Sequence, residues 1–267
     1  FPYYKNPKII LAISKSTFEY LCEMIFTDTH THQYLDAFDE DLEESIQRAI
    51  ENKVQRIFLP NIDLESIARV DGLVDRDAEM FFPMMGLHHC SVKSDYKEVL
   101  AHMKSLLDSK KYVAVGEIGI DLYWDKSTLP IQIDAFKIQI QWAKDKGLPI
   151  IIHARDSFNE IFEVVEEMND DRLFGIFHCF TGSKEQAERI IGFGGFKMGI
   201  GGVVTFKNSK LGEVIKNFDL KHLVLETDSP YLTPAPFRGK RNESSYIPYI
   251  AGKLSEMFDL PIEEIAK

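Results

Sequence analysis

Short apolar runs alternate with amphipathic stretches along most of this 267-residue chain. The runs are rich in Ile, Val and Phe, and short apolar segments bounded by polar stretches are typical of buried strands. The pattern predicts eight strands, at residues 25–27, 56–61, 81–87, 112–118, 148–154, 173–179, 196–201 and 223–228.

Between these runs, apolar residues recur with the period of a helix. We expect helices at residues 39–53, 63–76, 94–110, 129–147, 157–168, 183–191, 208–217 and 243–258. Ser94 is the expected N-cap of the helix at 94–110. Gly147 is expected to end the helix at 129–147, because glycine readily adopts the left-handed conformation required there.

The order of these elements predicts the fold class. Strands that alternate with helices form parallel βαβ units, and eight such units predict a closed (β/α)8 TIM barrel. The alternative is an open, doubly wound sheet, but no glycine-rich phosphate fingerprint follows the first strand to support it. We expect residues 24–267 to form this single domain, and residues 1–23 to be an appendage of unknown role.

Charge and cysteine content narrow the function further. The chain has 31 basic and 42 acidic residues, a net charge of −11. Such a surface repels polyanions, so a site that handles phosphates must hold cations of its own. No apolar run approaches the roughly 20 residues that span a bilayer. Three widely spaced cysteines argue against a disulfide framework and predict a cytoplasmic protein. No membrane association and no obligate protein partner are expected.

The stretch IFTDTHTHQYLD, at residues 25–36, places polar side chains directly after an apolar pair. Alternate residues of an extended strand share one face, so Asp28, His30 and His32 should project together. Burial of three such groups is unfavourable unless something binds them. A divalent metal ion would bind them.

Metal-binding residue types recur at the ends of the predicted strands. Barrel enzymes place their chemistry at the C-terminal ends of the strands. The residues at this end are His30, His32, Glu117, His153, His178 and Asp228. Four imidazoles and two carboxylates exceed the ligands of one catalytic zinc, so we expect two divalent ions.

Glu117 lies near the middle of the strand order and is the expected bridge between the two ions. One ion would be held by the HxH pair with Asp228, and the other by His153 and His178. Water between such ions becomes a ready hydroxide nucleophile, and Asp228 could take its proton. Imidazole and carboxylate ligands leave the metal open among Zn, Mn, Co and Mg.

Seven motifs together resemble the TatD family of metal-dependent deoxyribonucleases, within the amidohydrolase superfamily. They are TDTHTH, GEIGIDLYW, LPIIIHAR, HCFTGS, GIGGVVTFKNS, ETDSPYLTP and FRGKRNES, and they follow this order from residue 25 to about residue 246. The resemblance implies a metallo-dependent hydrolase barrel that cleaves phosphodiesters, in particular single-stranded DNA from the 3′ end. It assigns the same six metal ligands. With the bridge and the proton acceptor argued above, Glu117 and Asp228 are the expected catalytic residues.

Two features depart from the family pattern. GLHHC, at residues 86–90, keeps His88 but has His89 where the family has proline, which leaves the geometry of this loop open. The chain also stops at Lys267, within what resembles the final helical stretch of the family. We therefore expect the C-terminal end of the barrel to be incomplete.

Five further residues are candidates for substrate binding. They are His88, Arg155, Arg238, Lys240 and Arg241. Arg155 follows a ligand histidine by two residues, so in extended backbone it faces the same mouth and could bind a phosphate. The alternatives are a salt bridge for Arg155 and a solvated loop for the basic cluster at 238–241.

We therefore expect a hydrolase of phosphodiester bonds, in particular a 3′–5′ exonuclease on single-stranded DNA that uses water activated by two metals. The sequence does not distinguish DNA from other phosphodiester substrates. The first rival is an enzyme of the same superfamily that acts on amides, lactones or small phosphoesters. The second rival is a non-catalytic, metal-stabilised partner protein.

Overall fold

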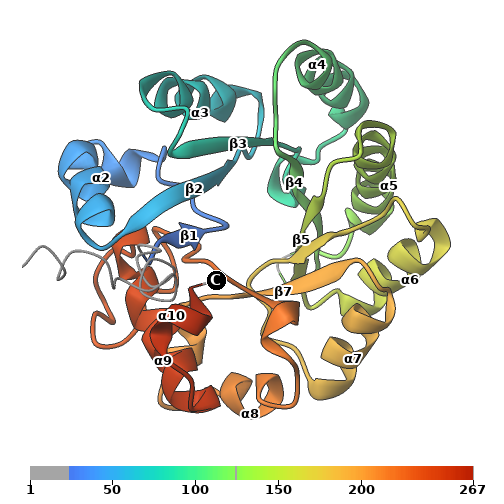
Figure 1. The fold of residues 1–267 in the computed structure, drawn as a ribbon. Helices are drawn as coiled ribbons and strands as arrows, with labels where there is room; N and C mark the ends of the chain where they lie inside the picture. The colour runs from blue at the N-terminus through green and yellow to red at the C-terminus, as the bar shows by residue number, and fades with distance from the viewer. Residues whose placement is uncertain (1–23, 124, 267) are drawn as a thin grey trace, which may run out of the picture.

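The computed structural model describes residues 24–123 and 125–266 and forms a barrel of parallel strands inside a ring of helices (Figure 1). The eight strands form one sheet in chain order, and each pairs in parallel with the next. They are β1 (Phe26–Asp28), β2 (Val54–Pro60), β3 (Phe81–Met85), β4 (Ala114–Asp121), β5 (Ile150–Arg155), β6 (Gly175–Phe177), β7 (Phe196–Ile200) and β8 (Leu223–Leu225).

The two edges of the sheet meet, so the barrel is nearly closed. The backbone N–H of Thr29, after β1, donates to the carbonyl of Leu225 in β8 at 3.1 Å. Past the strand ends, Thr31 and Ser229 form an isolated parallel bridge. These contacts confirm the predicted (β/α)8 barrel and exclude the open, doubly wound sheet.

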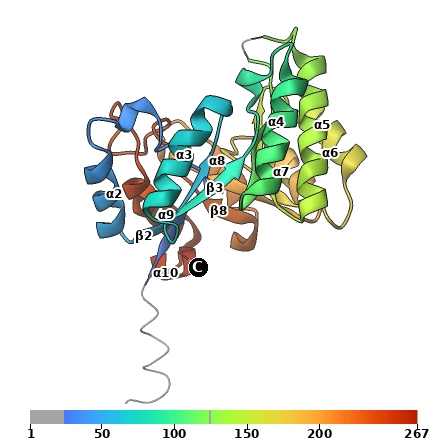
Figure 2. The same cartoon turned by 90° about the horizontal axis from the view of Figure 1, so that it is seen from above.

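The helices follow the strands around the outside of the barrel (Figures 1 and 2). They are α2 (Leu42–Glu51), α3 (Leu64–Arg76), α4 (Tyr96–Ser109), α5 (Leu129–Lys146), α6 (Phe158–Met168), α7 (Lys184–Gly192), α8 (Leu211–Ile215), α9 (Ile247–Phe258) and α10 (Ile262–Ile265). Five 3-10 helices lie between them: η1 (Asp36–Phe38), η2 (His89–Ser91), η3 (Gly202–Thr205), η4 (Leu220–His222) and η5 (Ser244–Tyr246).

The predicted helices are present, with differences at their ends. Gly147 ends α5 in the left-handed conformation, with φ of 64°, as expected. The prediction that Ser94 caps α4 is wrong, because Asp95 precedes the helix and makes no side-chain capping bond. Ser94 lies inside a turn in which the Tyr96 N–H donates to the Lys93 carbonyl at 3.0 Å.

Two apolar layers support the site. The larger lies between the strands and the helices, where side chains such as Phe26, Phe136 and Ile152 are buried. A small separate layer of Met84, Ala114 and Ile151 packs with partly buried neighbours. Ile151 shares a face of β5 with His153, because alternate strand residues point the same way. The small layer is therefore inside the barrel, beneath the polar residues.

The predicted appendage, residues 1–23, lies outside the described residues, and so does the chain end at Lys267. The barrel itself starts with β1 and runs through α10, which contacts α9 at the lower edge of the molecule in Figure 2. Within the described ranges, no helix combines the length and apolar character needed to cross a membrane.

Candidate metal centre

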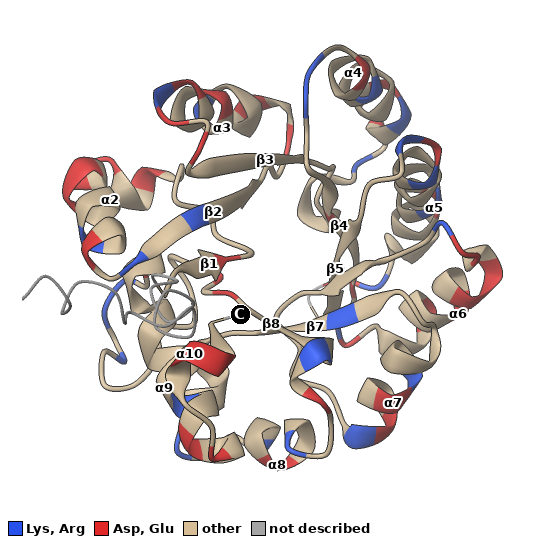
Figure 3. Cartoon of the chain, in the orientation of Figure 1, with Lys and Arg blue, Asp and Glu red and all other residues tan. Residues whose placement is uncertain are grey.

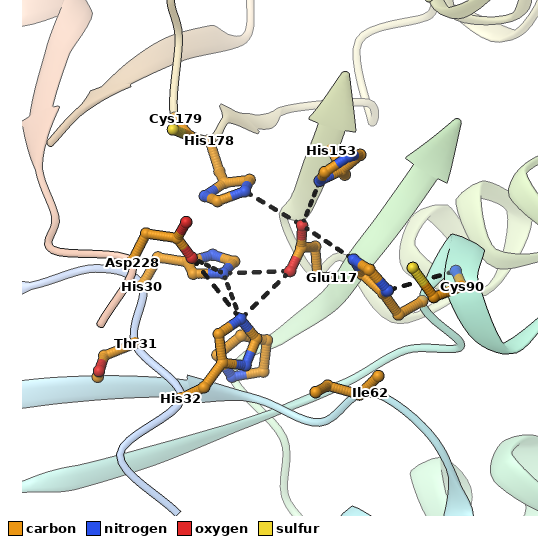
Figure 4. A network of polar contacts seen from close by, with 12 residues as sticks. His30, Thr31, His32, Ile62, Cys90, Glu117, His153, His178, Cys179 and Asp228 are labelled. Atoms are coloured by element: carbon orange, nitrogen blue, oxygen red, sulfur yellow. Dashed lines mark hydrogen bonds and ion pairs between the residues drawn. The ribbon is translucent and has the colours of Figure 1, made fainter. Parts of the chain in front are cut away.

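The carboxylate of Glu117 lies at the centre of a ring of histidines at one end of the barrel (Figure 4). Its two oxygens face different partners. Oε2 is 3.2 Å from Nε2 of His30 and 3.5 Å from Nε2 of His32. Oε1 is 2.7 Å from Nδ1 of His153 and 3.1 Å from Nε2 of His178. The six predicted ligands therefore include a carboxylate with one oxygen toward each half of the site.

Asp228 completes the half that contains the HxH pair. Its Oδ1 is 3.8 Å from Nε2 of both His30 and His32. Its backbone has φ of 56°, and its N–H donates to the His30 carbonyl at 2.9 Å. This bond ties the loop after β8 to the loop after β1. Burial raises the pKa of Asp228 to about 6.

The donor set fits a divalent cation better than it fits hydrogen bonds within the protein. Nε2 of His30 and Nε2 of His32 face each other at 3.3 Å, and both also approach Glu117. Nδ1 of His30 is buried and has no hydrogen-bond partner among the described residues. Burial, with the neighbouring His178, lowers the pKa of His30 well below its ordinary value. A neutral imidazole presents a lone pair, which is what a metal requires.

Glu117 supplies the negative charge of the centre. Its burial alone would raise the pKa of the carboxyl, but the neighbouring imidazoles, above all that of His178, outweigh burial and hold the pKa well below its ordinary value. Glu117 is therefore ionised at neutral pH. An ionised carboxylate with an oxygen toward each group of imidazoles can bridge two cations. Two groups of these residues could hold a divalent cation, because their ligand atoms lie within 4.8 Å of one another: His30, His32 and Glu117 form one group, and His88, Glu117 and His153 form another.

His88 joins the second half of the site. Its Nε2 is 3.4 Å from Oε1 of Glu117, so the substitution of His89 for proline leaves His88 at the centre. His89 is itself buried, and its Nε2 is 3.6 Å from Oδ2 of Asp121. Sequence analysis noted His89 only as a departure from the family pattern and assigned neither His89 nor Asp121 to the site. The sequence feature that could have identified Asp121 is its spacing from Glu117 on β4, because residues four apart in a strand point to the same side.

Asp28 does not join the two histidines, and in this respect the prediction from alternation is wrong. Its Oδ2 accepts hydrogen bonds from the hydroxyls of Thr227 at 2.6 Å and Ser244 at 2.7 Å, while its Oδ1 accepts from the Thr227 N–H at 2.9 Å. The regular strand β1 ends at Asp28, so the period of two does not extend through the HxH pair. Asp28 instead ties β1 to the chain that follows β8.

Glu226 is a second acid that the sequence analysis missed. It is fully buried, and its Oε1 accepts the backbone N–H of Cys179 and lies 3.5 Å from Nδ1 of His178. Glu226 can therefore help to orient His178, because it faces Nδ1 while Nε2 of the same ring faces Glu117. The sequence feature that could have identified Glu226 is its position two residues before Asp228 in the motif ETD.

Apart from His88, the predicted substrate-binding residues lie away from the centre, and three of them line two separate clefts rather than forming one cluster. Arg155 is exposed, and its guanidinium lies 3.7 Å from the centroid of the Tyr123 ring. It lines a cleft of about 480 Å³ with residues such as Thr181 and Gly182. Arg238 donates to the Thr233 carbonyl at 2.8 Å.

Lys240 and Arg241 line a different cleft of about 920 Å³, next to α2. Two N–H groups of Arg241 donate there to the carboxylate of Asp41, at 2.5 and 2.9 Å. Arg48 donates to the same Asp41 and to Glu243, at 2.8 and 2.6 Å. The charge of Arg241 is thus largely balanced by acids of the protein itself, whereas Lys240 is exposed. Figure 3 shows that most other charged residues lie on the outer helices.

Comparison with known proteins identifies a family and several relatives that match nearly the whole chain. The family model described as TatD related DNase matches residues 27–267. The uncharacterized metal-dependent hydrolase YabD of Bacillus subtilis is 42% identical over 244 residues, which cover 91% of this chain and 94% of YabD. The uncharacterized metal-dependent hydrolase YjjV of Escherichia coli is 33% identical, covering 91% of this chain and 93% of YjjV.

The structural comparison agrees with the sequence comparison. The crystal structure of YjjV, described as a TatD homolog from Escherichia coli, superimposes with a TM-score of 0.84 at 33% identity. The match covers 90% of this chain and 93% of the YjjV chain. A TatD family hydrolase from Entamoeba histolytica has the same fold, with a TM-score of 0.76 at 23% identity, covering 91% and 94% of the two chains.

Proposed function

Since this chain belongs to the TatD related DNase family of metal-dependent hydrolases, we propose that its site hydrolyses phosphodiester bonds of single-stranded DNA, from the 3′ end. The observation that carries the proposal is the position of Glu117. One of its carboxylate oxygens lies within 3.5 Å of two imidazole nitrogens, and the other lies within 3.4 Å of three. This arrangement supports a two-metal centre.

Divalent ions bound at such a centre polarise a phosphoryl oxygen and lower the pKa of water toward neutrality. The side chains supply the rest of the chemistry. Glu117 stays ionised and keeps both groups of imidazoles in position. Asp228 reaches the edge of the centre beside His30 and His32, and we assign to it the proton that leaves the attacking water. Hydrolysis then yields two products, one with a phosphate and one with a hydroxyl.

Exposed aromatic rings at the rim support a nucleic-acid substrate. Tyr231, three residues past Asp228, is 55% exposed, and its ring centroid is 6.5 Å from that of His32. Tyr123, two residues past β4, is 50% exposed. Bases stack on exposed aromatic rings without sequence preference, whereas an amide or lactone has no base to stack. Because the net charge is −11, binding must depend on such local contacts and on the metal centre.

We also propose that the cations at the rim contact the flanking phosphates. Arg155, Arg238 and Lys240 are exposed, and His88 lies beside Glu117. The bidentate pair with Asp41 leaves Arg241 a smaller part in this contact than its place in the RGKR motif implied. A cytoplasmic location is part of the same proposal, and the wide spacing of the cysteines supports it.

The test uses a single-stranded oligonucleotide labelled at the 5′ end in one sample and at the 3′ end in another. The metal-depleted protein is assayed with Mn²⁺, Mg²⁺, Co²⁺ or Zn²⁺, and the Glu117→Gln variant serves as the matched control. We expect the 5′-labelled strand to shorten in a ladder while the 3′-labelled strand releases a mononucleotide at once. Absence of cleavage with every metal, together with turnover of an amide or lactone, would support the first rival instead.

A further inference from the structure

Asp121, the last residue of β4, approaches the metal centre from behind His153. We infer that Asp121 is a positioning residue, which keeps the proton of His153 on Nε2 and thereby turns the lone pair of Nδ1 toward Glu117 and the metal centre. This inference rests on the proposed function in one respect only, namely that the centre holds metal.

The two nitrogens of His153 face two different carboxylates. Nδ1 is 2.7 Å from Oε1 of Glu117, and Nε2 is 3.0 Å from Oδ2 of Asp121. A neutral imidazole has one N–H donor and one lone pair. If Nδ1 coordinates an ion on the Glu117 side, where Figure 4 shows the ring pointing, the proton must be on Nε2. Asp121 is the acceptor for that proton, and such acceptors orient metal-ligating histidines.

The protein holds the carboxylate of Asp121 in place. Its Oδ1 accepts the backbone N–H of Tyr123 at 2.8 Å. Its own backbone is anchored to α5, where Gln132 Oε1 accepts the Asp121 N–H at 2.9 Å and Gln132 Nε2 donates to the Asp121 carbonyl at 3.2 Å. Asp121 and Gln132 are both buried. The acceptor is therefore positioned before any metal binds.

His89 lies close enough to Asp121 and His153 for a different arrangement, in which the three residues share a cation. Its Nε2 is 3.6 Å from the same oxygen of Asp121, and its ring centroid is 4.3 Å from that of His153. A third cation could be held by His89, Asp121 and His153, whose donor atoms lie within 4.8 Å of one another. Such a cation would need the lone pair of Nε2, and a neutral His153 cannot offer both nitrogens as lone pairs. The 3.0 Å contact favours the hydrogen bond.

The experiment measures zinc binding by the full-length protein rather than catalysis. Zn²⁺ affinity is determined by competition with a chromogenic chelator, and the number of ions at saturation by elemental analysis. We expect Asp121→Ala to weaken Zn²⁺ binding by about 10–100-fold. Asp121→Asn should lose less, because its amide oxygen still accepts from Nε2. The number of ions at saturation should be the same in all three proteins.

Asp125→Asn is the matched control, because Asp125 is an exposed acid on the same loop and its side chain accepts from the Ser127 N–H instead. Its zinc affinity should equal that of the wild type. Long-range ¹H–¹⁵N spectra of the zinc-loaded wild type, assigned by loss of the His153 signals in His153→Gln, should show a metal-bound Nδ1 and a protonated Nε2. Circular dichroism checks that each variant is folded.

Three results would overturn the inference. The first is wild-type zinc affinity in a folded Asp121→Ala protein. The second is a protonated Nδ1 in zinc-loaded His153. The third is the loss of one ion at saturation in both Asp121→Ala and His89→Gln, with unchanged affinity for the others, which would establish the third cation site. None of these readouts depends on DNA cleavage, so a failure of the nuclease proposal is separate from a failure here.

Discussion

The metal centre and the ion-pair network beside α2 both gather charged and polar side chains, but in opposite ways. At the centre, five imidazoles surround one carboxylate, and ring nitrogens of His30 and His32 face each other at 3.3 Å. In the network, two arginines meet two acids, and their donors and acceptors pair with one another. The first arrangement leaves Nδ1 of His30 and Nδ1 of His178 buried without a hydrogen-bond partner among the described residues, whereas the second is nearly complete by itself.

The difference separates a binding site from a structural one. Both regions looked functional in sequence, because a histidine pair and an RGKR motif each suggest a ligand. A cluster of similar donors is unfavourable unless a cation completes it, so such a cluster indicates function. A cluster of opposite charges satisfies itself and stabilises the loop that carries it, at a modest level for partly exposed groups.

The largest expected effect comes from breaking the centre at its carboxylate. Glu117→Gln keeps the shape of the side chain but removes the charge that both groups of imidazoles share. We expect DNA cleavage to fall below detection and the metal content after dialysis to drop well below that of the wild type. Elemental analysis and the end-labelled assay measure the two effects. Near-normal turnover with full metal content would exclude Glu117 as the bridge.

Asp228→Asn tests the proton-transfer role at the same centre. Asparagine retains an oxygen beside His30 and His32 but cannot accept a proton, and loss of a general base typically lowers the rate by about 10²–10⁴. We expect kcat to fall by that factor, with a smaller change in KM and an unchanged melting temperature. The measurement is steady-state kinetics on the oligonucleotide. An unchanged kcat would reduce Asp228 to a metal ligand.

The exposed cations of the rim give a smaller, salt-dependent effect. Each phosphate contact on single-stranded DNA contributes a slope of about −0.7 to the plot of log affinity against log salt. The double variant Arg238→Ala/Lys240→Ala should therefore raise KM for oligonucleotides and flatten this slope by about 1.4. Hydrolysis of bis-p-nitrophenyl phosphate should not change, because it has no flanking phosphates. Equal losses on both substrates would assign the pair a structural role.

The smallest effect should come from the network beside α2. Hydrogen bonds from Arg241 and Arg48 lower the pKa of Asp41 to about 2. The pKa of an aspartate in the unfolded chain is about 3.9. Because the folded-state pKa is the lower one, the stabilisation is complete above about pH 5 and disappears as the pH falls from about 4 to about 2.

Asp41→Asn should therefore lower the free energy of unfolding by about 1 kcal/mol or less at pH 7, as is typical of exposed ion pairs. The difference from the wild type should vanish at the acid end, in urea titrations repeated at several pH values. Asp36→Asn is a suitable control, since Asp36 is far more exposed, with 91% side-chain exposure, and pairs with Arg69 instead. A difference that does not change with pH would mean that Asp41 acts through packing.

The periodic pattern of the sequence was enough for the architecture. Strand-length apolar runs between helical stretches determined the order of the elements, because burial against both the barrel interior and the helices requires apolar residues at nearly every strand position. The ends of those strands then identified His30, Glu117 and His153, since all strands of a parallel barrel end at the same mouth. Helix ends were less predictable. Ser94 does not have its expected N-cap position at α4, because a turn forms from the same residues.

Only the tertiary structure decided which partner each polar group has. The carboxylate of Asp28 accepts from Thr227 and Ser244 and from the backbone N–H of His30, but it does not contact the imidazole rings of the HxH pair, because β1 ends at Asp28. Arg241 pairs with Asp41, 200 residues away. The periodicity of the sequence indicates which face of an element a side chain occupies. Hydrogen bonds and ion pairs, however, depend on distances of a few ångströms between residues remote in sequence. Those distances arise only when the sheet has closed and the loops from both its edges meet.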